Sequence, residues 1–507
     1  MSIPIIFIFP SDHNVFRPLT GRTALNIAYF AIVGALTSFQ QLNIPFFASF
    51  APSTLRPSPH TIFVMAIVTS RNALLPGSNE LQPATITVNI GTGKITDIQT
   101  VYAERSPGGE TTFIDAGEKF VLPGLVDAHV HLNEPGRTDW EGFWTGTRAA
   151  VAGGITTVVD MPLNSIPPAT TLQNLEIKRQ TAQGQSWADA DLKPLVAAGV
   201  KGFKCFLIES GVEEFPCVSE HDPHAHMQEL LDQSTVLLFH AELEGDSCSV
   251  QNNEEHDPTA YQTFLSSCPQ ELEVNAISLI TRLQERYNSL RCHIVHLSAS
   301  SALPIIRAAR SRKLNLTVET CFHYLCLSAD SVPRGRPEFK CCPPIRSESN
   351  RDALWEALID GTIDCVVSEH SPWVAELKKF EEGNIMTAWG GINSLGFGLS
   401  LLWTEGRRRG VSLGQIIRWT SEETVKHAGL SSSKGQLSVG YDGDLVIWDP
   451  AAEFKVSKEH FHFNNKFSSY EGMVLNGVVQ QTILRGRMAY DRTQNGFDSL
   501  TPIGKLL

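Results

Sequence analysis

Residues 364–373, DCVVSEHSPW, show how strands end in this chain. The apolar run CVV predicts a buried strand, and an acid and a histidine, Glu369 and His370, follow it directly. Taken alone, this pattern also fits a solvated loop after an ordinary strand. Several other apolar runs in the sequence end in the same way, and this repetition indicates a functional edge of a sheet.

Similar apolar runs recur along the middle of the chain, separated by helical stretches. Near-continuous apolar strands alternating with helices indicate a parallel sheet covered by helices, and seven or eight such units favour a closed β/α barrel of the TIM type. No GxGxxG motif argues for a dinucleotide site. We place the strands within residues 119–132 and at residues 156–162, 201–208, 235–242, 291–298, 314–320 and 363–371.

One barrel strand has no evident place. Only GQSWADA separates the helix expected at residues 172–183 from the next helical stretch, which begins near Asp191. A strand of about five residues with its loops does not fit comfortably there. We therefore count seven strands where closure of an eight-stranded (β/α)8 barrel requires one more.

The segments before and after these alternating strands and helices have a different residue pattern. Short β-branched runs with glycine turns occur at residues 84–99, and similar runs return at residues 440–450 and 482–491. These runs predict one small β-sandwich domain made from both ends of the chain. The expected organisation is an extension at 1–64, the first part of the sandwich at 65–121, the β/α barrel at 122–432, and the second part of the sandwich with a C-terminal tail at 433–507.

Composition favours small-molecule chemistry inside the cell. The net charge of -13 argues against a nucleic-acid or anionic-membrane partner, because phosphate binding needs a basic surface. The 10 cysteines include no CxxC pair, so they fit neither a disulfide scaffold nor a zinc ribbon and indicate buried reduced thiols. We expect a cytoplasmic protein that forms homo-oligomers.

The first 64 residues leave a second localisation open. The segment ALNIAYFAIVGAL, residues 24–36, is strongly apolar, yet its dense part is shorter than the roughly 20 residues that a membrane span requires. A poorly ordered extension is the expected structure, with a membrane or organelle anchor as the alternative.

Histidines stand at the ends of three predicted strands. In the first, His129 and His131 are two residues apart, and strand alternation places both imidazoles on one face. His240 and His296 end two later strands. Because barrel enzymes carry their reactive groups at the carboxyl ends of strands, these histidines are candidate metal ligands.

Lys204 lies within the apolar run GFKCF, where a buried ammonium group is costly. Burial lowers the pKa of a lysine, and a neutral amine can take up carbon dioxide to form an anionic carbamate that bridges two cations. A lysine that extends to the surface is the alternative. Glu369 would then supply an oxygen ligand and a base.

Several stretches together carry a family resemblance, namely residues 119–132, NEPGRTDWEGF (133–143), TTVVDMPLNS (156–165), GFKCFLIESG (202–211), KCCPPIR (340–346), GNIMTAWGGI (383–392) and GDLVIWDP (443–450). With these stretches the chain resembles the allantoinases, a cyclic-amidohydrolase branch of the metal-dependent amidohydrolases. The resemblance covers about residues 65–490.

The resemblance implies hydrolysis of the hydantoin ring of allantoin to allantoate, a step of purine breakdown. It implies two Zn²⁺ bound by His129, His131, carboxylated Lys204, His240, His296 and Glu369, with Glu369 as the catalytic base. It further implies a substrate pocket lined by Asn164, Cys341, Cys342, Pro343 and Ser371.

Two departures from the family leave alternatives open. The family has an aspartate where this chain has Glu369, and a barrel strand where this chain has only GQSWADA. One extra methylene displaces the carboxylate by about 1.3 Å, and about 1 Å of misplacement can cost on the order of a hundredfold in rate. A catalytically impaired relative and a dihydropyrimidinase or hydantoinase are the alternative functions.

Overall fold

A computed structural model describes residues 65–507 apart from residues 79, 105–110, 192–200, 219–221, 232, 234 and 246–256. The expected extension at residues 1–64, with its apolar segment, lies outside the described residues. Nearly all of the helical stretch expected from Asp191 also lies outside them. Within the described ranges, no helix combines the length and the apolar character needed to cross a membrane.

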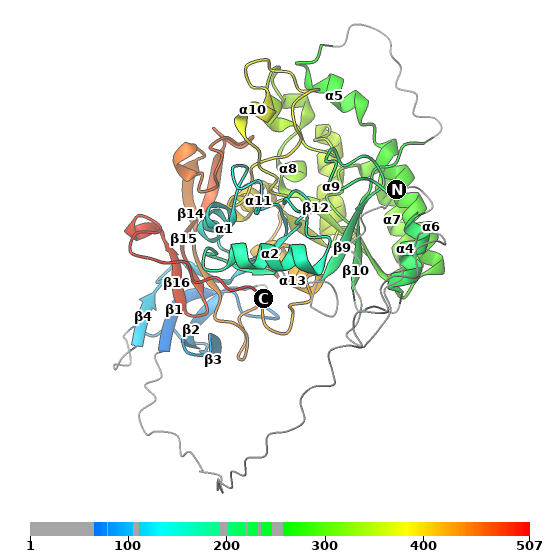
Figure 1. Cartoon of the computed structure of the whole chain (residues 1–507). Coiled ribbons are helices and arrows are strands. Elements are labelled where there is room, and N and C mark those ends of the chain that lie inside the picture. Colours follow the sequence, from blue (N-terminus) through cyan, green and yellow to red (C-terminus); the bar gives the residue numbers. More distant parts are fainter. Residues whose placement is uncertain are drawn as a thin grey trace, which may run out of the picture. The chain divides into compact units, whose positions relative to one another are not determined.

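Strands from both ends of the chain form one small β domain, as expected. β5 pairs antiparallel with β14 and so joins the early strands to the late ones, in the order β16-β15-β14-β5-β1-β2-β3, with β4 paired to β1. The blue and red strands accordingly lie together in Figure 1. The strands are β1 Met65–Ala73, β2 Gln82–Asn89, β3 Lys94–Gln99, β4 Thr111–Asp115, β5 Phe120–Pro123, β14 Leu445–Lys455, β15 Val474–Leu484 and β16 Arg487–Asp491.

The middle of the chain forms parallel strands in two hydrogen-bonded groups, β6-β7-β8 and β9-β10-β11-β12-β13. All six residues of β6 and all five of β10 are buried, because in a β/α barrel helices cover the outer face of the sheet and the inner face packs in the interior. An isolated bridge joins Val130, at the end of β6, to His370, beyond β13. The strands are β6 Leu125–Val130, β7 Ile155–Asp160, β8 Asp189–Asp191, β9 Gly202–Phe206, β10 Val236–His240, β11 Arg291–Ile294, β12 Leu316–Cys321 and β13 Cys365–Val367.

Helices follow most of these strands in sequence. In α6, Leu272, Ala276 and Ile280 recur at a spacing of four residues and are buried, which is the pattern of a helix packed by one face. The helices are α1 Phe143–Ala152, α2 Leu172–Ala182, α4 Asp222–Leu230, α5 Tyr261–Ser267, α6 Glu271–Arg286, α7 Leu303–Ser311, α8 Phe322–Cys326, α9 Glu348–Ile359, α10 Ala375–Lys378, α11 Gly398–Arg407, α12 Leu413–Ile417 and α13 Glu423–His427.

The count of seven barrel strands is wrong by one, because β8 forms inside the segment that seemed too short. Its three residues pair parallel with β7, with Thr157 opposite Asp189 and Val159 opposite Asp191. A strand of only three residues forms here because the C-terminal segment and a buried charge cluster also contact it. The strands still differ from those of a regular barrel, because β8 and β9 share no hydrogen-bonded pairing among the described residues.

The C-terminal segment occupies the other edge of β8. Ala190 N donates to Lys505 O at 2.9 Å, and Leu507 N donates to Ala190 O at 3.0 Å, so this segment adds to β8 in parallel. Gly504 N donates to Ser186 O at 2.8 Å. A side chain at Gly504 would place its Cβ 2.1 Å from the Ala188 carbonyl, so this close approach requires glycine.

A buried charge cluster ties β8 to the small β domain. Lys434 Nζ lies 2.8 Å from Asp189, 3.0 Å from Asp442 and 2.7 Å from Asp444. Arg485 also pairs with Asp189. The three carboxylates could ligate a cation by their spacing, but the Lys434 ammonium group already lies among them. We interpret this cluster as structural.

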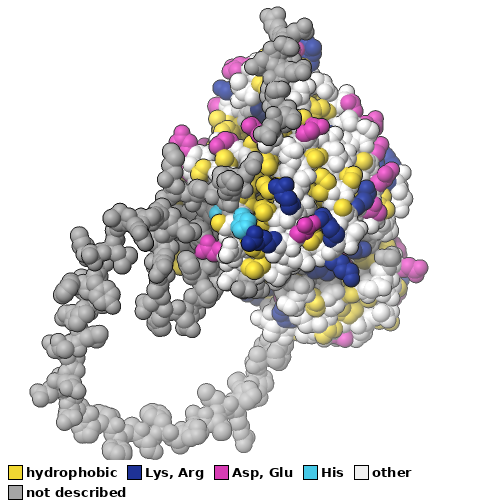
Figure 2. Space-filling model, turned by 90° about the vertical axis from the view of Figure 1, so that its right-hand side faces the viewer, with side chains coloured by type: hydrophobic (Ala, Val, Ile, Leu, Met, Phe, Trp, Pro, Cys, Tyr) yellow, Lys and Arg dark blue, Asp and Glu magenta, His cyan; other side chains and the backbone are white. Residues whose placement is uncertain are grey.

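Charged side chains are mixed on the surface. On the face shown in Figure 2, Lys and Arg side chains are interspersed with Asp, Glu and apolar side chains. A nucleic-acid site requires a continuous basic surface instead. The described residues of this face form no such continuous basic surface.

Candidate metal centre

The first histidine pair lies at the carboxyl end of β6. A hydrogen bond of 2.5 Å joins His129 Nδ1 to Glu319 Oε1 on β12, and His129 Nε2 lies 2.9 Å from Lys204 Nζ on β9. His131 Nδ1 donates to the Met161 carbonyl at 3.0 Å. Because a carbonyl only accepts, this bond fixes the tautomer of His131 and leaves Nε2 with its lone pair free for a metal.

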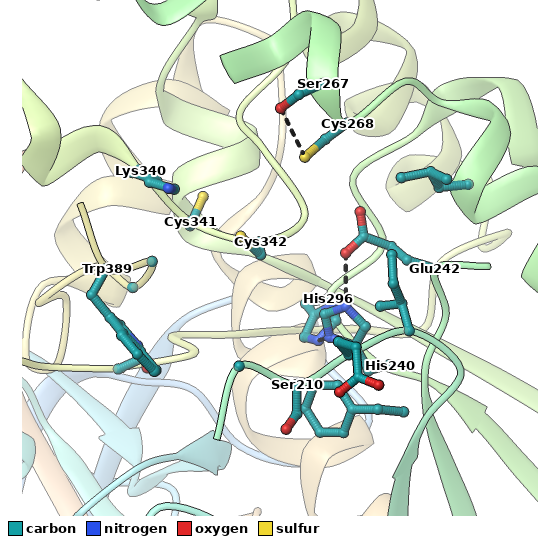
Figure 3. Close-up of a pocket in the computed structure, with 18 of the residues that line it drawn as sticks. Ser210, His240, Glu242, Ser267, Cys268, His296, Lys340, Cys341, Cys342 and Trp389 are labelled. Carbon is teal, nitrogen blue, oxygen red and sulfur yellow. Dashed lines mark hydrogen bonds and ion pairs between the residues drawn. The ribbon is translucent and has the colours of Figure 1, made fainter. Parts of the chain in front are cut away.

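The second pair comes from β10 and from the turn after β11. His240 Nδ1 lies 3.0 Å from His296 Nε2, and His240 Nε2 lies 2.7 Å from Glu242 Oε2. Phe206 stacks on the His240 ring at 4.5 Å and holds it from one side. Figure 3 shows Glu242 above the two imidazoles. The rings of His129 and His296 are 5.6 Å apart, so the two pairs meet in one centre.

Burial keeps the imidazoles of His129, His131 and His296 neutral. The pKa values of His129, His131 and His296 lie well below the ordinary histidine value, first because burial penalises the charged ring and then because neighbouring cationic groups repel it. A neutral imidazole is the form that ligates a metal. These three imidazoles are thus in the form that can ligate a metal at neutral pH.

Lys204 lies at the centre of this group, as the apolar strand around it predicted. It is 8% exposed, and burial lowers the pKa of its amine, while the charges of Glu369 and Glu319 act in the opposite direction. The alternative of a lysine that reaches the surface is wrong, because its Nζ contacts His129 inside the barrel.

Glu369 completes the centre from the loop after β13. Its Oε1 lies 3.8 Å from His296 Nε2, and its Oε2 lies 3.6 Å from His323 Nε2 and 3.5 Å from Cys321 Sγ. Burial raises the pKa of Glu369 to about 8, which the charge of Lys204 partly offsets. Cys321, His323 and Glu369 form a group whose spacing could hold a metal ion.

Backbone strain accompanies the two candidate ligands that come from loops. His296 and Glu369 have φ values of 42° and 43°, in the left-handed region that residues with a Cβ rarely adopt. Such conformations persist where the surrounding structure holds them, often at functional sites. Sequence reasoning placed both residues at strand ends but had no signal for this conformation.

Sequence reasoning missed several supporting residues. Glu319 is fully buried, contacts His129 and also lies 3.1 Å from His293 Nε2. Burial raises its pKa to about 8. A single acid inside the apolar strand LTVETC was a usable signal, as was Glu242 two residues after His240. His323 and Cys321 had no such signal, because they meet Glu369 only through the fold.

A cavity of about 1000 Å³ opens onto this centre. Four of the five residues assigned to the substrate pocket line it, namely Asn164, Cys341, Cys342 and Ser371. Pro343 is not among the lining residues, and its carbonyl accepts a hydrogen bond of 2.7 Å from the Tyr324 hydroxyl. In Figure 3, Lys340 and Trp389 lie across the cavity from Glu242 and His240.

Comparison with known proteins shows which family the chain belongs to. Residues 120–489 match the amidohydrolase family. The allantoinase of Saccharomyces cerevisiae is 45% identical over 459 residues, which cover 87% of this chain and 98% of that protein. The chain belongs to the amidohydrolase family, among the allantoinases. The allantoinase of Streptomyces avermitilis is 45% identical over 432 residues, with 83% of this chain and 94% of that protein covered.

A solved structure shares the fold of this allantoinase-family chain. The L-hydantoinase (dihydropyrimidinase) of Arthrobacter aurescens superposes with a TM-score of 0.76 and 28% identity, covering 87% of this chain and 97% of that one. This likeness confirms the expected fold class, an α/β barrel fold with a small β domain made from both ends of the chain, while among the described residues the barrel strands stay in two hydrogen-bonded groups.

The donor set of this allantoinase-family chain fits divalent cations. Two contacts between nitrogen atoms, from His129 to Lys204 and from His240 to His296, bring donor groups together without a carboxylate between them. Imidazole nitrogens and a carboxylate oxygen are ligands that zinc accepts. Glu319 and Glu242 contact the far side of two of these rings, which is the usual support of a metal-bound histidine.

Proposed function

We propose that the chain hydrolyses the hydantoin-ring amide of allantoin to give allantoate. The observation that carries this proposal is the meeting of His129, Lys204 and Glu319 from three separate barrel strands at distances of 2.5 and 2.9 Å. The choice of allantoin as the substrate rests on relatives named allantoinase, which are 45% identical over most of the chain.

We propose two Zn²⁺ as the cofactors, with Lys204 carboxylated between them. The neutral amine of Lys204 would form a bond to the carbon of carbon dioxide and release one proton, which replaces a costly buried cation by an anionic oxygen ligand. The complete ligand set would be His129, His131, carboxylated Lys204, His240, His296 and Glu369.

When bound, such cations would polarise the amide carbonyl and make a water molecule acidic near neutral pH. Glu369 would accept a proton from the attacking water and deliver it to the ring nitrogen that leaves. A bond forms between the water oxygen and the carbonyl carbon, and the bond from that carbon to the ring nitrogen breaks. The product is a ring-opened ureido acid.

The cavity residues would hold the ring against this centre. Asn164, Cys341, Cys342 and Ser371 line the cavity and would contact the substrate directly, while Pro343 would shape the turn that carries the two cysteines. Cavities of this size suit small ligands with a few placed polar groups.

A second candidate is hydrolysis of another cyclic amide, such as hydantoin or dihydrouracil. The solved hydantoinase with a TM-score of 0.76 favours it, but at 28% identity rather than 45%. Ring-opening assays with allantoin, hydantoin and dihydrouracil decide between the two. We expect allantoin to have the highest kcat/KM, and a preference for dihydrouracil would overturn the proposal.

A further inference from the structure

A buried amine lies behind the cavity wall. Lys378, the last residue of α10, is 1% exposed and is not among the residues that line the cavity. Its Nζ donates to the Gly391 carbonyl at 2.6 Å and to the Lys340 carbonyl at 3.3 Å. Among the described residues, no carboxylate lies within ion-pair distance of it. Lys378 therefore acts on the main chain rather than on an acid.

The two carbonyls belong to two segments that line the cavity, Lys340–Cys342 and Trp389–Gly391. Gly391 N also donates to the Lys340 carbonyl at 2.9 Å. A Cβ at Gly390 would lie 3.3 Å from Cys342 Sγ, so the two segments touch. The amine of Lys378 thus holds together two neighbouring parts of the wall.

The packing around Gly391 leaves little room for movement. A Cβ at this position would lie 2.2 Å from the Ser371 carbonyl and 2.2 Å from Trp373 Nε1. Ser371 N in turn donates to the Ile392 carbonyl at 3.1 Å. A shift of the Gly391 carbonyl would therefore move Ser371 and Trp373, which also line the cavity.

The direction of a carbonyl also sets the direction of the next amide. A trans peptide is planar, and its C=O and N–H point to opposite sides. Because the Lys340 carbonyl points to Lys378, the N–H of Cys341 points away from Lys378. Lys378 thus orients polar main-chain groups in the segment that carries both cavity cysteines.

We propose that Lys378 is a positioning residue of the substrate site, which fixes the Lys340–Cys342 and Trp389–Gly391 segments and so sets substrate affinity without contacting the metal centre. This inference rests on the proposed function. A neutral amine has two N–H donors, enough for both carbonyls. Burial lowers the pKa of Lys378 to about 7, so this neutral form is available near neutral pH.

Lys378→Met tests the inference because methionine fills a similar space but donates no hydrogen bond. The Gly391 carbonyl would then keep no hydrogen bond among the described residues. We expect the KM for allantoin to rise about tenfold or more with kcat within about threefold of wild type. Metal content should not change.

Lys466→Met is the control for the loss of a lysine that donates to main-chain carbonyls, although Lys466 is exposed where Lys378 is buried. Lys466 Nζ also donates to two main-chain carbonyls, those of Phe461 at 2.5 Å and Phe463 at 2.6 Å, and it does not line the cavity. We expect its KM to remain within about twofold of wild type. An equal rise of KM in both variants would mean a general structural effect and would overturn the inference.

Hydrogen exchange separates this inference from the proposed function, because it needs no turnover. In Lys378→Met, amides of residues 340–342 and 389–392 should exchange about tenfold faster or more, while those of residues 129–131 keep the wild-type rate. If the wild type does not open allantoin, the proposed function fails and exchange still decides the role of Lys378. Unchanged exchange and unchanged KM would overturn the inference. If Lys378→Met and the shorter donor Lys378→Gln both fail to fold, Lys378 is a core residue and the inference is wrong.

Discussion

Glu319 Oε1 lies 2.5 Å from His129 Nδ1, and Lys204 contacts the other nitrogen of the same ring. A carboxylate in this position orients the imidazole and strengthens it as a ligand. Glu319 therefore links β12 to a proposed ligand on β6, although it is not itself among the proposed metal ligands.

Glu319→Gln should weaken metal binding by about 10- to 100-fold, because an amide holds the histidine tautomer less firmly than a carboxylate does. Competition with a coloured chelator measures the affinity, and circular dichroism checks that the variant is folded. Wild-type metal affinity in a folded variant would contradict the supporting role.

Glu369→Gln should reduce kcat by about 100-fold or more, because the amide can neither accept the proton of the water nor deliver it to the ring nitrogen. Metal analysis of the same sample is the control, since the amide oxygen is a weaker ligand. A kcat within tenfold of wild type would exclude Glu369 as the base.

Glu369→Asp restores the residue type expected from the family resemblance. If glutamate is well placed at its φ of 43°, the shorter side chain should lower kcat or leave it unchanged. A gain of about tenfold or more would show that the extra methylene impairs this chain. No turnover in either form with saturating zinc would support a catalytically silent relative.

Gly504→Ala should destabilise the protein by about 1–3 kcal/mol, because the added Cβ would meet the Ala188 carbonyl and displace the segment that pairs with β8. Urea denaturation measures the change. Thr501→Ala is the control, because this exposed residue of the same tail should change stability by less than about 0.5 kcal/mol. Equal stability of both variants would mean that the tail does not support β8.

The lowered pKa of Lys378 also predicts that the stability of the protein depends on pH. Its pKa in the folded protein is about 7, below the ordinary 10.5, so between these values the unfolded chain binds a proton that the folded chain does not. The free energy of unfolding should therefore rise with pH, by at most about 1.4 kcal/mol per unit from this group. The groups that face it are Cys341, Cys342, Glu338 and Lys340.

Urea denaturation at pH 7 and pH 9 measures this dependence in the wild type and in Lys378→Met. The variant lacks the titrating group, so it should gain less stability over this interval. Burial raises the pKa of the Cys341 thiol well above its ordinary value, so this group stays neutral over the interval. If the free energy of unfolding rises with pH by the same amount in the variant and in the wild type, Lys378 does not have the lowered pKa of a buried amine.

The strands that carry the site could be predicted from local sequence, because each is an apolar run whose polar end marks the edge of the sheet. His129, His131, His240 and Glu369 follow this rule, and Lys204 stands out as a charge within such a run. These features are local, so one sequence suffices to find them.

The residues that depend on distant contacts could not be found in this way. β8 has only three residues, and its second edge is held by Lys505 and Leu507, more than 300 positions later in the chain. Lys378 donates to main-chain carbonyls, and because every residue has one, the sequence does not reveal this contact. The expected homo-oligomer and the extension at residues 1–64 stay predictions.

Metal content measured on the same sample as allantoin hydrolysis tests the central claim most directly. The six proposed ligands predict about two zinc ions per chain and activity that a chelator removes and zinc restores. Full hydrolysis by protein that holds no metal, or tight zinc binding that survives replacement of both His129 and His240 by alanine, would contradict the account.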